Sequence, residues 1–200
     1  QELGKTRKAV QAVAKEIIDI YAKKQNLRPF NYLTDAELEG ALVSSFAFKE
    51  TPDQKAAIDA VLKDMLKPRP MDRLVCGDVG FGKTEVAIRA IMRATISKKA
   101  SIFLCPTTIL ADQHYITCKE RLGSLGVRIE LLSRFKTKKE QIKIMKKCEG
   151  GLIDLLIGTH RLLSPDVFLS SLGLLIIDEE HRFGVKHKEK IRKLKTHLDV

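Results

Sequence analysis

Glycines, a lysine and a threonine form the most specific chemical pattern in this chain, G-x-x-x-x-G-K-T from Gly77 to Thr84. Gly77, Gly80 and Gly82 allow positive φ and close approach of the backbone, so that successive N–H groups can converge on phosphate oxygens. Lys83 supplies an ammonium group for the β- and γ-phosphates, and the hydroxyl of Thr84 suits Mg²⁺. The helix expected to follow adds the partial positive charge of its N-terminus. The pattern therefore predicts a nucleoside triphosphate site.

Two carboxylates follow an apolar run near the end of the chain. The run 174–177 has the character of a buried strand, and it ends at Asp178 and Glu179. Beside a phosphate loop, Asp178 can hold Mg²⁺ through water together with the loop threonine, and Glu179 can orient or deprotonate the attacking water. His181 is placed to couple the γ-phosphate region to a nucleic-acid surface. We therefore predict Lys83, Asp178 and Glu179 as catalytic residues, in preference to a solvated acidic turn.

An aromatic pair and a glutamine precede the phosphate loop. Phe46 and Phe48 lie upstream of a helix that Thr51 and Pro52 are expected to begin as N-cap and first residue. A ring can stack on adenine, and the amide of Gln54 can pair with the donor and acceptor at the edge of that base. Core packing of the rings and a surface position for the glutamine remain open as alternatives.

Apolar runs and helical patterns alternate along the chain from residue 71. Expected strands are 71–76, 101–105, 127–132, 152–157 and 172–177, and expected helices are 52–66, 84–97, 109–122, 137–147 and 185–198. Alternation of this kind implies right-handed crossovers and a mostly parallel sheet with helices on both faces. Ligands of such sheets gather at the carboxyl ends of the strands, where the polar clusters that follow the expected strands lie. The fold class is α/β.

The first 44 residues are expected to form a helical arm, with a single larger domain at 45–200. The stretch 5–25 has apolar residues at spacings of three and four on a basic background, which predicts an amphipathic helix. We prefer packing of its apolar stripe on the neighbouring domain to a DNA or membrane face. After a break at 29–33, Thr34 and Glu37 have the spacing of a capping box for a second helix.

The composition favours a polyanionic partner. The net charge is +11 and the pI is about 9.5, which for a phosphate-binding enzyme points to nucleic acid, although separation from an acidic remainder would give the same excess. Four cysteines without C-x-x-C pairs indicate reduced thiols in a cytoplasmic protein. The expected partners exclude membrane, because no apolar run approaches the roughly 20 residues of a span. A start at Gln1 rather than Met suggests a piece of a longer protein.

Several segments together resemble superfamily 2 helicase-like motors and, within them, the bacterial transcription-repair coupling factors. The segments that carry the resemblance are 46–54, 70–74, 77–85, 106–111, 133–135, 157–163 and 178–185. RecG-type fork helicases share the layout but typically have Ser at the position of Phe81 and Asp-Glu-Gln-His where this chain has Asp-Glu-Glu-His, so we rank them second. The family implies a RecA-like fold for the lobe, with ATP and Mg²⁺ as cofactors.

The resemblance also assigns roles to residues. Phe46 or Phe48, with Gln54, would hold adenine, and Gly82, Lys83, Thr84 and Glu85 would hold phosphates and metal. The residues implied to face the backbone of double-stranded DNA are Thr107, Thr108, Ser133, Arg134, Thr159, His160 and Arg161. Hydroxyl groups and arginines of this kind grip phosphates without reading bases.

In the family a second RecA-like lobe follows and supplies an arginine to the ATP site. Because an arginine finger is worth roughly 10³- to 10⁵-fold in rate, we expect this chain, a monomer, to bind nucleotide but hydrolyse it feebly. The resemblance implies an ATP-driven duplex-DNA translocase that displaces stalled RNA polymerase and works with excision-repair proteins. A RecG-like fork-remodelling helicase and a nucleotide-switched protein-binding module are the alternatives.

Overall fold

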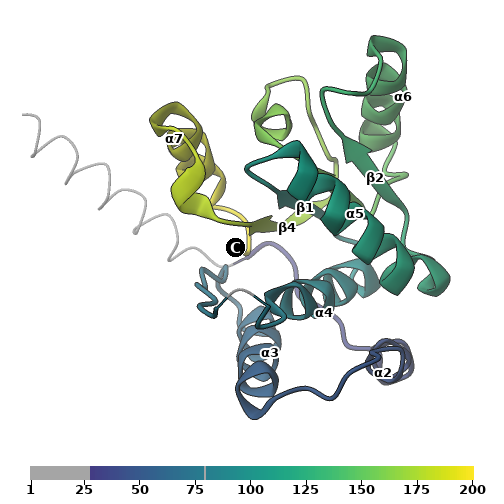
Figure 1. Cartoon of the computed structure of the whole chain (residues 1–200), viewed down its shortest axis with the longest axis vertical. Helices are drawn as coiled ribbons and strands as arrows, with labels where there is room; N and C mark the ends of the chain where they lie inside the picture. Colours follow the sequence, from purple (N-terminus) through teal and green to yellow (C-terminus); the bar gives the residue numbers. More distant parts are fainter. Residues whose placement is uncertain (1–27, 79) are drawn as a thin grey trace, which may run out of the picture.

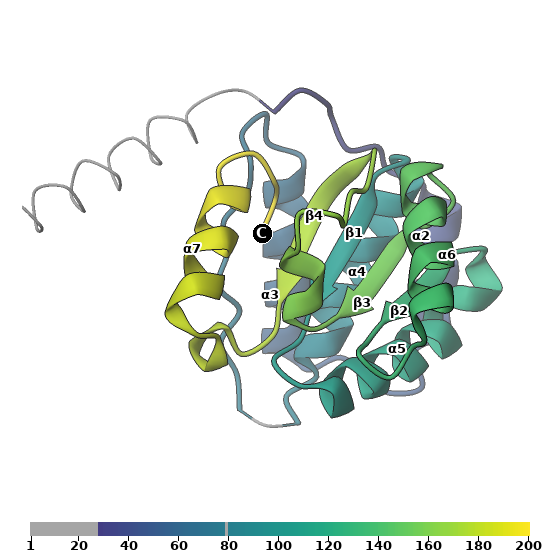
Figure 2. The same ribbon diagram turned by 90° about the horizontal axis from the view of Figure 1, so that it is seen from above.

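A parallel sheet of four strands lies at the centre of the chain. The computed structural model describes residues 28–78 and 80–200. The strands are β1 (Ala100–Leu104), β2 (Ile129–Leu132), β3 (Leu155–Gly158) and β4 (Leu172–Ile177). All their pairings are parallel, in the order β2-β3-β1-β4, which Figure 2 shows from above. The predicted α/β class and parallel sheet are confirmed.

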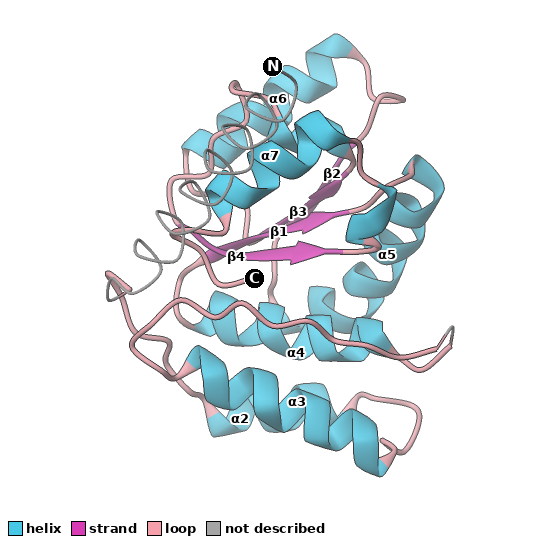
Figure 3. Cartoon of the chain, turned by 90° about the vertical axis from the view of Figure 1, so that its left-hand side faces the viewer, coloured by secondary structure: helices cyan, strands magenta, loops and turns pink. Residues whose placement is uncertain are grey.

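Helices cover both faces of this sheet, as predicted. They are α2 (Ala36–Ser44), α3 (Pro52–Met65), α4 (Lys83–Ile96), α5 (Thr108–Leu122), α6 (Lys138–Glu149) and α7 (Val185–Leu194), with short 3₁₀ turns η1 (Gly123–Leu125), η2 (His160–Leu163) and η3 (Glu180–Arg182). Figures 1 and 3 show α2, α3 and α4 on one side of the sheet and α6 and α7 on the other.

Successive side chains of each strand point to opposite faces of the sheet, and the apolar ones form a separate core on each face. On β3, Leu155 and Ile157 pack with α2 to α5, whereas Leu156 packs with α6, α7 and η2. Both faces of β3 are therefore apolar, which explains why this strand appears in the sequence as a continuous apolar run. The layers place the ends of β1, β3 and β4 at one common edge.

Local hydrogen bonds define where the helices begin. Thr51 caps α3, and its side chain and that of Gln54 form a reciprocal capping box, as the sequence predicted for the cap. The predicted capping box of α2 is wrong, because Asp35 rather than Thr34 is the N-cap and its carboxylate accepts from the N–H groups of Glu37 and Leu38 at 3.0 Å. A carboxylate at this position also interacts favourably with the helix dipole.

The predicted strand at 71–76 is not formed. Arg73 N–H donates to the carbonyl of Val200 and Val200 N–H donates to that of Met71, which ties only the start of the segment to the sheet. Asp199 lies between this segment and β4, where it forms an isolated bridge with Leu174. A β-strand forms hydrogen bonds to a neighbouring strand along its whole length. Beside this segment, Asp199 and Val200 supply two residues of such a neighbour.

A buried ion pair joins the start of the described chain to its end. Arg28 Nη1 donates to both carboxylate oxygens of Asp199 at 2.9 Å, and Nη2 donates to the carbonyls of Met65 and Lys67 at 2.6 Å. Both side chains are almost fully buried. The expected helix at 5–25 lies outside the described residues, and the domain boundary after residue 44 stays a prediction.

The four cysteines are free thiols. Burial raises the pKa of Cys118 to about 12 and that of Cys148 to about 11. Within the described ranges, no helix is long and apolar enough to cross a membrane.

Candidate nucleotide site and adjoining groove

The phosphate loop lies where the strands end. In Figure 3 the arrowheads of the sheet point to the side on which α4 begins after the loop. Gly80 and Gly82 have φ of 84° and 75°, in the region that favours glycine. A Cβ on Gly77 would lie 2.7 Å from the ring of Phe81, so that position needs glycine for close approach. Lys83 Nζ donates to the carbonyls of Gly77 and Asp78 at 2.6 and 2.9 Å.

Gln54 contacts the loop directly. Its amide nitrogen donates to the carbonyl of Phe81, while its amide oxygen accepts from Thr51 N–H at 2.9 Å. Phe46 and Phe48 contact each other edge to face, with ring centroids 5.8 Å apart, and Phe48 is 77% exposed. The structure thus places Gln54 at the loop, and it leaves a large aromatic ring exposed near the start of α3.

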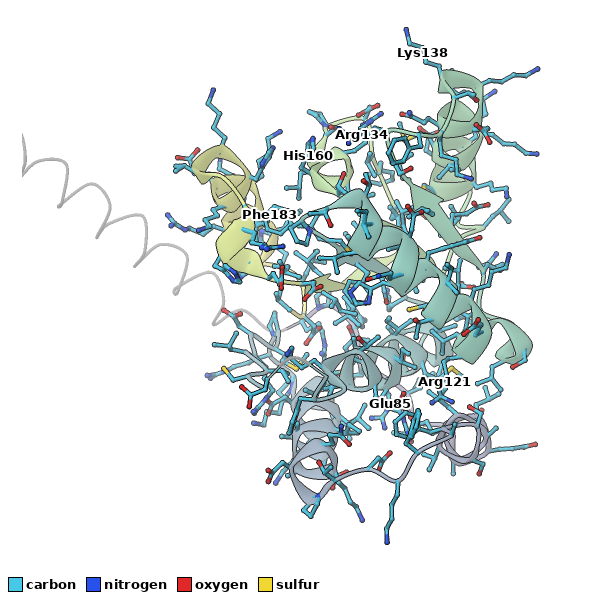
Figure 4. The ribbon with its side chains drawn as sticks, in the orientation of Figure 1. Glu85, Arg121, Arg134, Lys138, His160 and Phe183 are labelled. Atoms are coloured by element: carbon cyan, nitrogen blue, oxygen red, sulfur yellow. The ribbon has the colours of Figure 1, made fainter. Side chains whose placement is uncertain are left out.

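The side chain of Glu85 is held by two arginines. It is buried and accepts from Arg89 Nε at 2.6 Å and from Arg121 Nη2 at 2.9 Å; Figure 4 shows Glu85 beside Arg121. The Arg121 guanidinium also lies 5.1 Å from the centre of the Phe46 ring. Glu85 therefore joins α4 to α5 and, through Arg121, to the segment of Phe46, and its role toward phosphates or metal stays a prediction. An i,i+4 pattern with Arg89 was the only sequence signal for this arrangement.

Asp178 has a partner that sequence reasoning missed. His114 Nε2 of α5 lies 3.0 Å from Asp178 Oδ2, and the His114 ring stacks on Phe103 with centroids 4.4 Å apart. The hydrogen bond from His114 lowers the pKa of Asp178, and the charge of Lys83 adds to this against the effect of burial. Asp178 is thus held as a carboxylate within the field of Lys83. A single histidine in a polar helix carries no pattern that would have revealed this contact.

Glu179 has unusual backbone geometry. Its φ of 48° and ψ of 54° place a non-glycine residue in the left-handed region, where the conformational cost is roughly 1–3 kcal/mol and functional residues are concentrated. Its carboxylate is 3.1 Å from Arg182 Nη1. His181, within η3, is exposed. The structure therefore places the carboxylate and the predicted coupling residue in one short turn after β4.

A groove lies at the carboxyl edge of the sheet, the edge on which the phosphate loop also lies. It has a volume of about 490 Å³ and is lined by Pro106, Thr107, Thr108, Arg134, Gln141, Thr159, His160 and Arg161. These residues follow β1, β2 and β3, three strands that end side by side. Six of the seven residues predicted to face DNA line this one groove, and Figure 4 shows Arg134 and His160 together.

Ser133 is the exception, because its side chain is buried and its hydroxyl accepts from Phe135 N–H at 3.3 Å. Among the groove arginines, Arg134 is exposed and lies 5.2 Å from the Phe135 ring centre. Arg161 is bound by Asp166 through two hydrogen bonds of 2.7 and 2.6 Å. The Arg161 guanidinium thus already binds a carboxylate, whereas that of Arg134 is exposed to a new anion.

The donor set fits a nucleotide with Mg²⁺. The loop combines two left-handed glycines, a cradle that a Cβ would fill, and the first turn of a 14-residue helix. Within 28–78 and 80–200, no three His, Cys, Asp or Glu residues cluster as a protein-only metal site. Mg²⁺ commonly takes one or two protein oxygens with phosphate and water oxygens, which agrees with Thr84 and Asp178 as the predicted ligands.

A family model supplies the decisive comparison. Residues 51–200 match the model described as DEAD/DEAH box helicase. The chain belongs to this family. As a DEAD/DEAH box helicase domain it is a helicase-type ATPase lobe with a RecA-like fold, and the family binds ATP.

Individual bacterial proteins are also similar to this chain. The transcription-repair-coupling factors of Haemophilus influenzae, Escherichia coli and Bacillus subtilis are each 50% identical over 196 residues. The chain spans 17% of the length of each of these relatives, and 98% of its own residues are aligned. The resemblance to coupling factors is confirmed.

A solved structure extends the comparison to the fold. The structure of RecG bound to a three-way DNA junction matches 88% of this chain and 23% of the RecG chain, at 37% identity and a TM-score of 0.74. The helicase-domain architecture is therefore shared with a protein that was captured on DNA.

Proposed function

We propose that this chain is the ATP-binding lobe of an ATP-driven translocase on double-stranded DNA, and that the parent protein displaces stalled RNA polymerase and couples transcription to excision repair. The observation that carries the proposal is the groove, because its hydroxyl, arginine and histidine side chains lie at the sheet edge that also holds the phosphate loop. The similarity to transcription-repair-coupling factors at 50% identity supports the choice of parent function.

Each residue of the nucleotide site has a separate task. Lys83 and the N-terminus of α4 attract the phosphates, Gln54 and Phe46 or Phe48 hold adenine, and Thr84 and Asp178 hold Mg²⁺. When bound, Mg²⁺ would neutralise charge that develops on the phosphates. Glu179 orients the attacking water or accepts a proton from it.

The groove binds the backbone of the duplex. Arg134 and Arg161 supply charge, Thr107, Thr108 and Thr159 supply hydroxyl groups, and contacts of this type hold phosphates in any sequence. The net charge of +11 favours the same partner. His181 remains a proposed link between the two sites, and Ser133 and Glu85 are left out of the contacting set.

Measuring duplex affinity against salt tests this proposal. Replacing Arg134 with Ala should weaken binding and reduce the slope of log affinity against log salt by about one. Lys98→Ala is the matched control, because Lys98 is exposed and precedes β1 at the opposite edge. Equal affinity and slope for Arg134→Ala and the wild type would favour a protein-docking module instead.

The similarity to RecG supports fork remodelling as a second candidate. An assay on the parent protein separates the two candidates. Displacement of a stalled polymerase without regression of model forks is expected for the coupling function, and the reverse result would favour fork remodelling.

A further inference from the structure

Helix α5 contacts both parts of the candidate site. Thr107 caps the helix by accepting from Leu110 N–H at 3.3 Å, and both Thr107 and Thr108 line the groove. His114 follows six residues after Thr108 in the same helix, about 9 Å along its axis. At that point the helix reaches Asp178, at the end of β4.

The surroundings of His114 fix its orientation. Its side chain is 14% exposed, and its ring lies on Phe103 of β1 with an angle of 29° between the planes. An aspartate carboxylate oxygen only accepts, so in this 3.0 Å contact Asp178 Oδ2 is the acceptor and Nε2 of His114 is the donor. One ring nitrogen thus fixes the carboxylate that is predicted to hold Mg²⁺, while the ring itself is fixed by the sheet.

We propose that His114 is a positioning residue, which ties the Asp178 carboxylate to α5 so that DNA in the groove changes Mg²⁺ and nucleotide binding through this hydrogen bond. The inference rests on the proposed function, since it requires DNA in the groove and nucleotide at the loop. It assigns a role to a residue that neither the motif pattern nor the groove contains.

Rigidity of the helix is the physical basis. The backbone hydrogen bonds of α5 make it move as a unit, so a DNA contact that shifts Thr107 and Thr108 also shifts His114 relative to Asp178. Hydrogen bonds weaken steeply with distance and angle, and partners that orient a ligand commonly affect metal affinity by 10- to 100-fold. By thermodynamic linkage, nucleotide must then change DNA affinity by the same factor.

Two substitutions separate this role from simple packing. His114→Phe keeps a ring of similar size against Phe103 but cannot donate to Asp178. His114→Gln loses the ring but keeps an N–H donor at the corresponding distance from the backbone. Gln113→Ala is the control, because Gln113 is exposed on the same helix. A packing role predicts that Phe is tolerated and Gln is not, and the positioning role predicts the opposite.

The experiment uses the 200-residue chain and a fluorescent ATP analogue. Its Kd is measured with and without a saturating short duplex, and Mg²⁺ is titrated in each case. For the wild type and Gln113→Ala we expect duplex to change the Kd by about fivefold or more. For His114→Phe the change should vanish, and half-maximal binding should need about tenfold more Mg²⁺. His114→Gln should restore part of both effects.

Each other outcome overturns the inference. Wild-type coupling in His114→Phe would show that the hydrogen bond carries nothing between the sites. A wild type that binds ATP analogue and duplex independently would overturn the coupling while leaving the proposed function intact. A wild type that binds neither would remove the proposed function, and the inference with it. Should His114→Phe not fold, loss of coupling in folded His114→Gln would decide against the positioning role.

Discussion

Replacing Gly82 with Ala perturbs the junction of the phosphate loop and Gln54. At a φ of 75° an alanine costs roughly 1–2 kcal/mol. Its Cβ would also lie 2.6 Å from Gln54 Nε2. The flexible amide must then move and give up its bond to the Phe81 carbonyl, worth about 0.5–1.5 kcal/mol. We expect a total loss of about 1.5–3.5 kcal/mol in the free energy of unfolding.

Gly80→Ala is the matched control, because Gly80 has a φ of 84° and no heavy atom lies within 4 Å of the place that its Cβ would take. Urea denaturation should show only the backbone cost of roughly 1–2 kcal/mol for it. Binding of an ATP analogue should weaken in Gly82→Ala by up to about tenfold as Gln54 is displaced. Equal unfolding free energies for the two variants, or unchanged binding in Gly82→Ala, would refute this reasoning.

Three further predictions concern ion pairs and caps. Arg28→Ala leaves a buried carboxylate unpaired and should lower the free energy of unfolding by about 3–5 kcal/mol; urea denaturation measures this, and a loss below about 1 kcal/mol would contradict it. Asp35→Ala should cost about 1 kcal/mol and Thr34→Ala much less, because Asp35 is the cap; equal costs in thermal unfolding would count against this assignment. Asp166→Asn should strengthen duplex binding by releasing the arginine it holds in the groove, and weaker binding would be inconsistent with that role.

The fold was predictable because burial on both faces makes each central strand an unbroken apolar run. Leu155, Leu156 and Ile157 pack alternately into the two cores, and this arrangement is visible in the sequence itself. The segment 71–76 ends in the apolar residues Leu74, Val75 and Cys76, but strand formation also depends on a neighbour along its length. In the described part of the chain, Asp199 and Val200 bind the backbone at the start of this segment, and a sequence pattern contains no information on that neighbour.

Local geometry was predictable where a motif fixes it, as at Gly82 and Lys83. Contacts between distant residues were not predictable. His114 and Asp178 are 64 residues apart, and they meet because the fold brings the His114 ring onto Phe103 of β1, beside the residue that follows β4. The contact of Glu85 with Arg121 was missed for the same reason, since Arg121 lies 36 residues away in another helix.

Hydrogen exchange measured separately with duplex DNA and with Mg²⁺–ATP tests the central claim most directly. Amides protected by a ligand exchange more slowly, so the affected peptides locate each site. We predict that duplex slows exchange in 106–110, 133–136 and 158–163, and that Mg²⁺–ATP slows exchange in 77–85. Protection by duplex confined to segments outside the groove, or none at all, would contradict the assignment of this lobe as a DNA translocase motor.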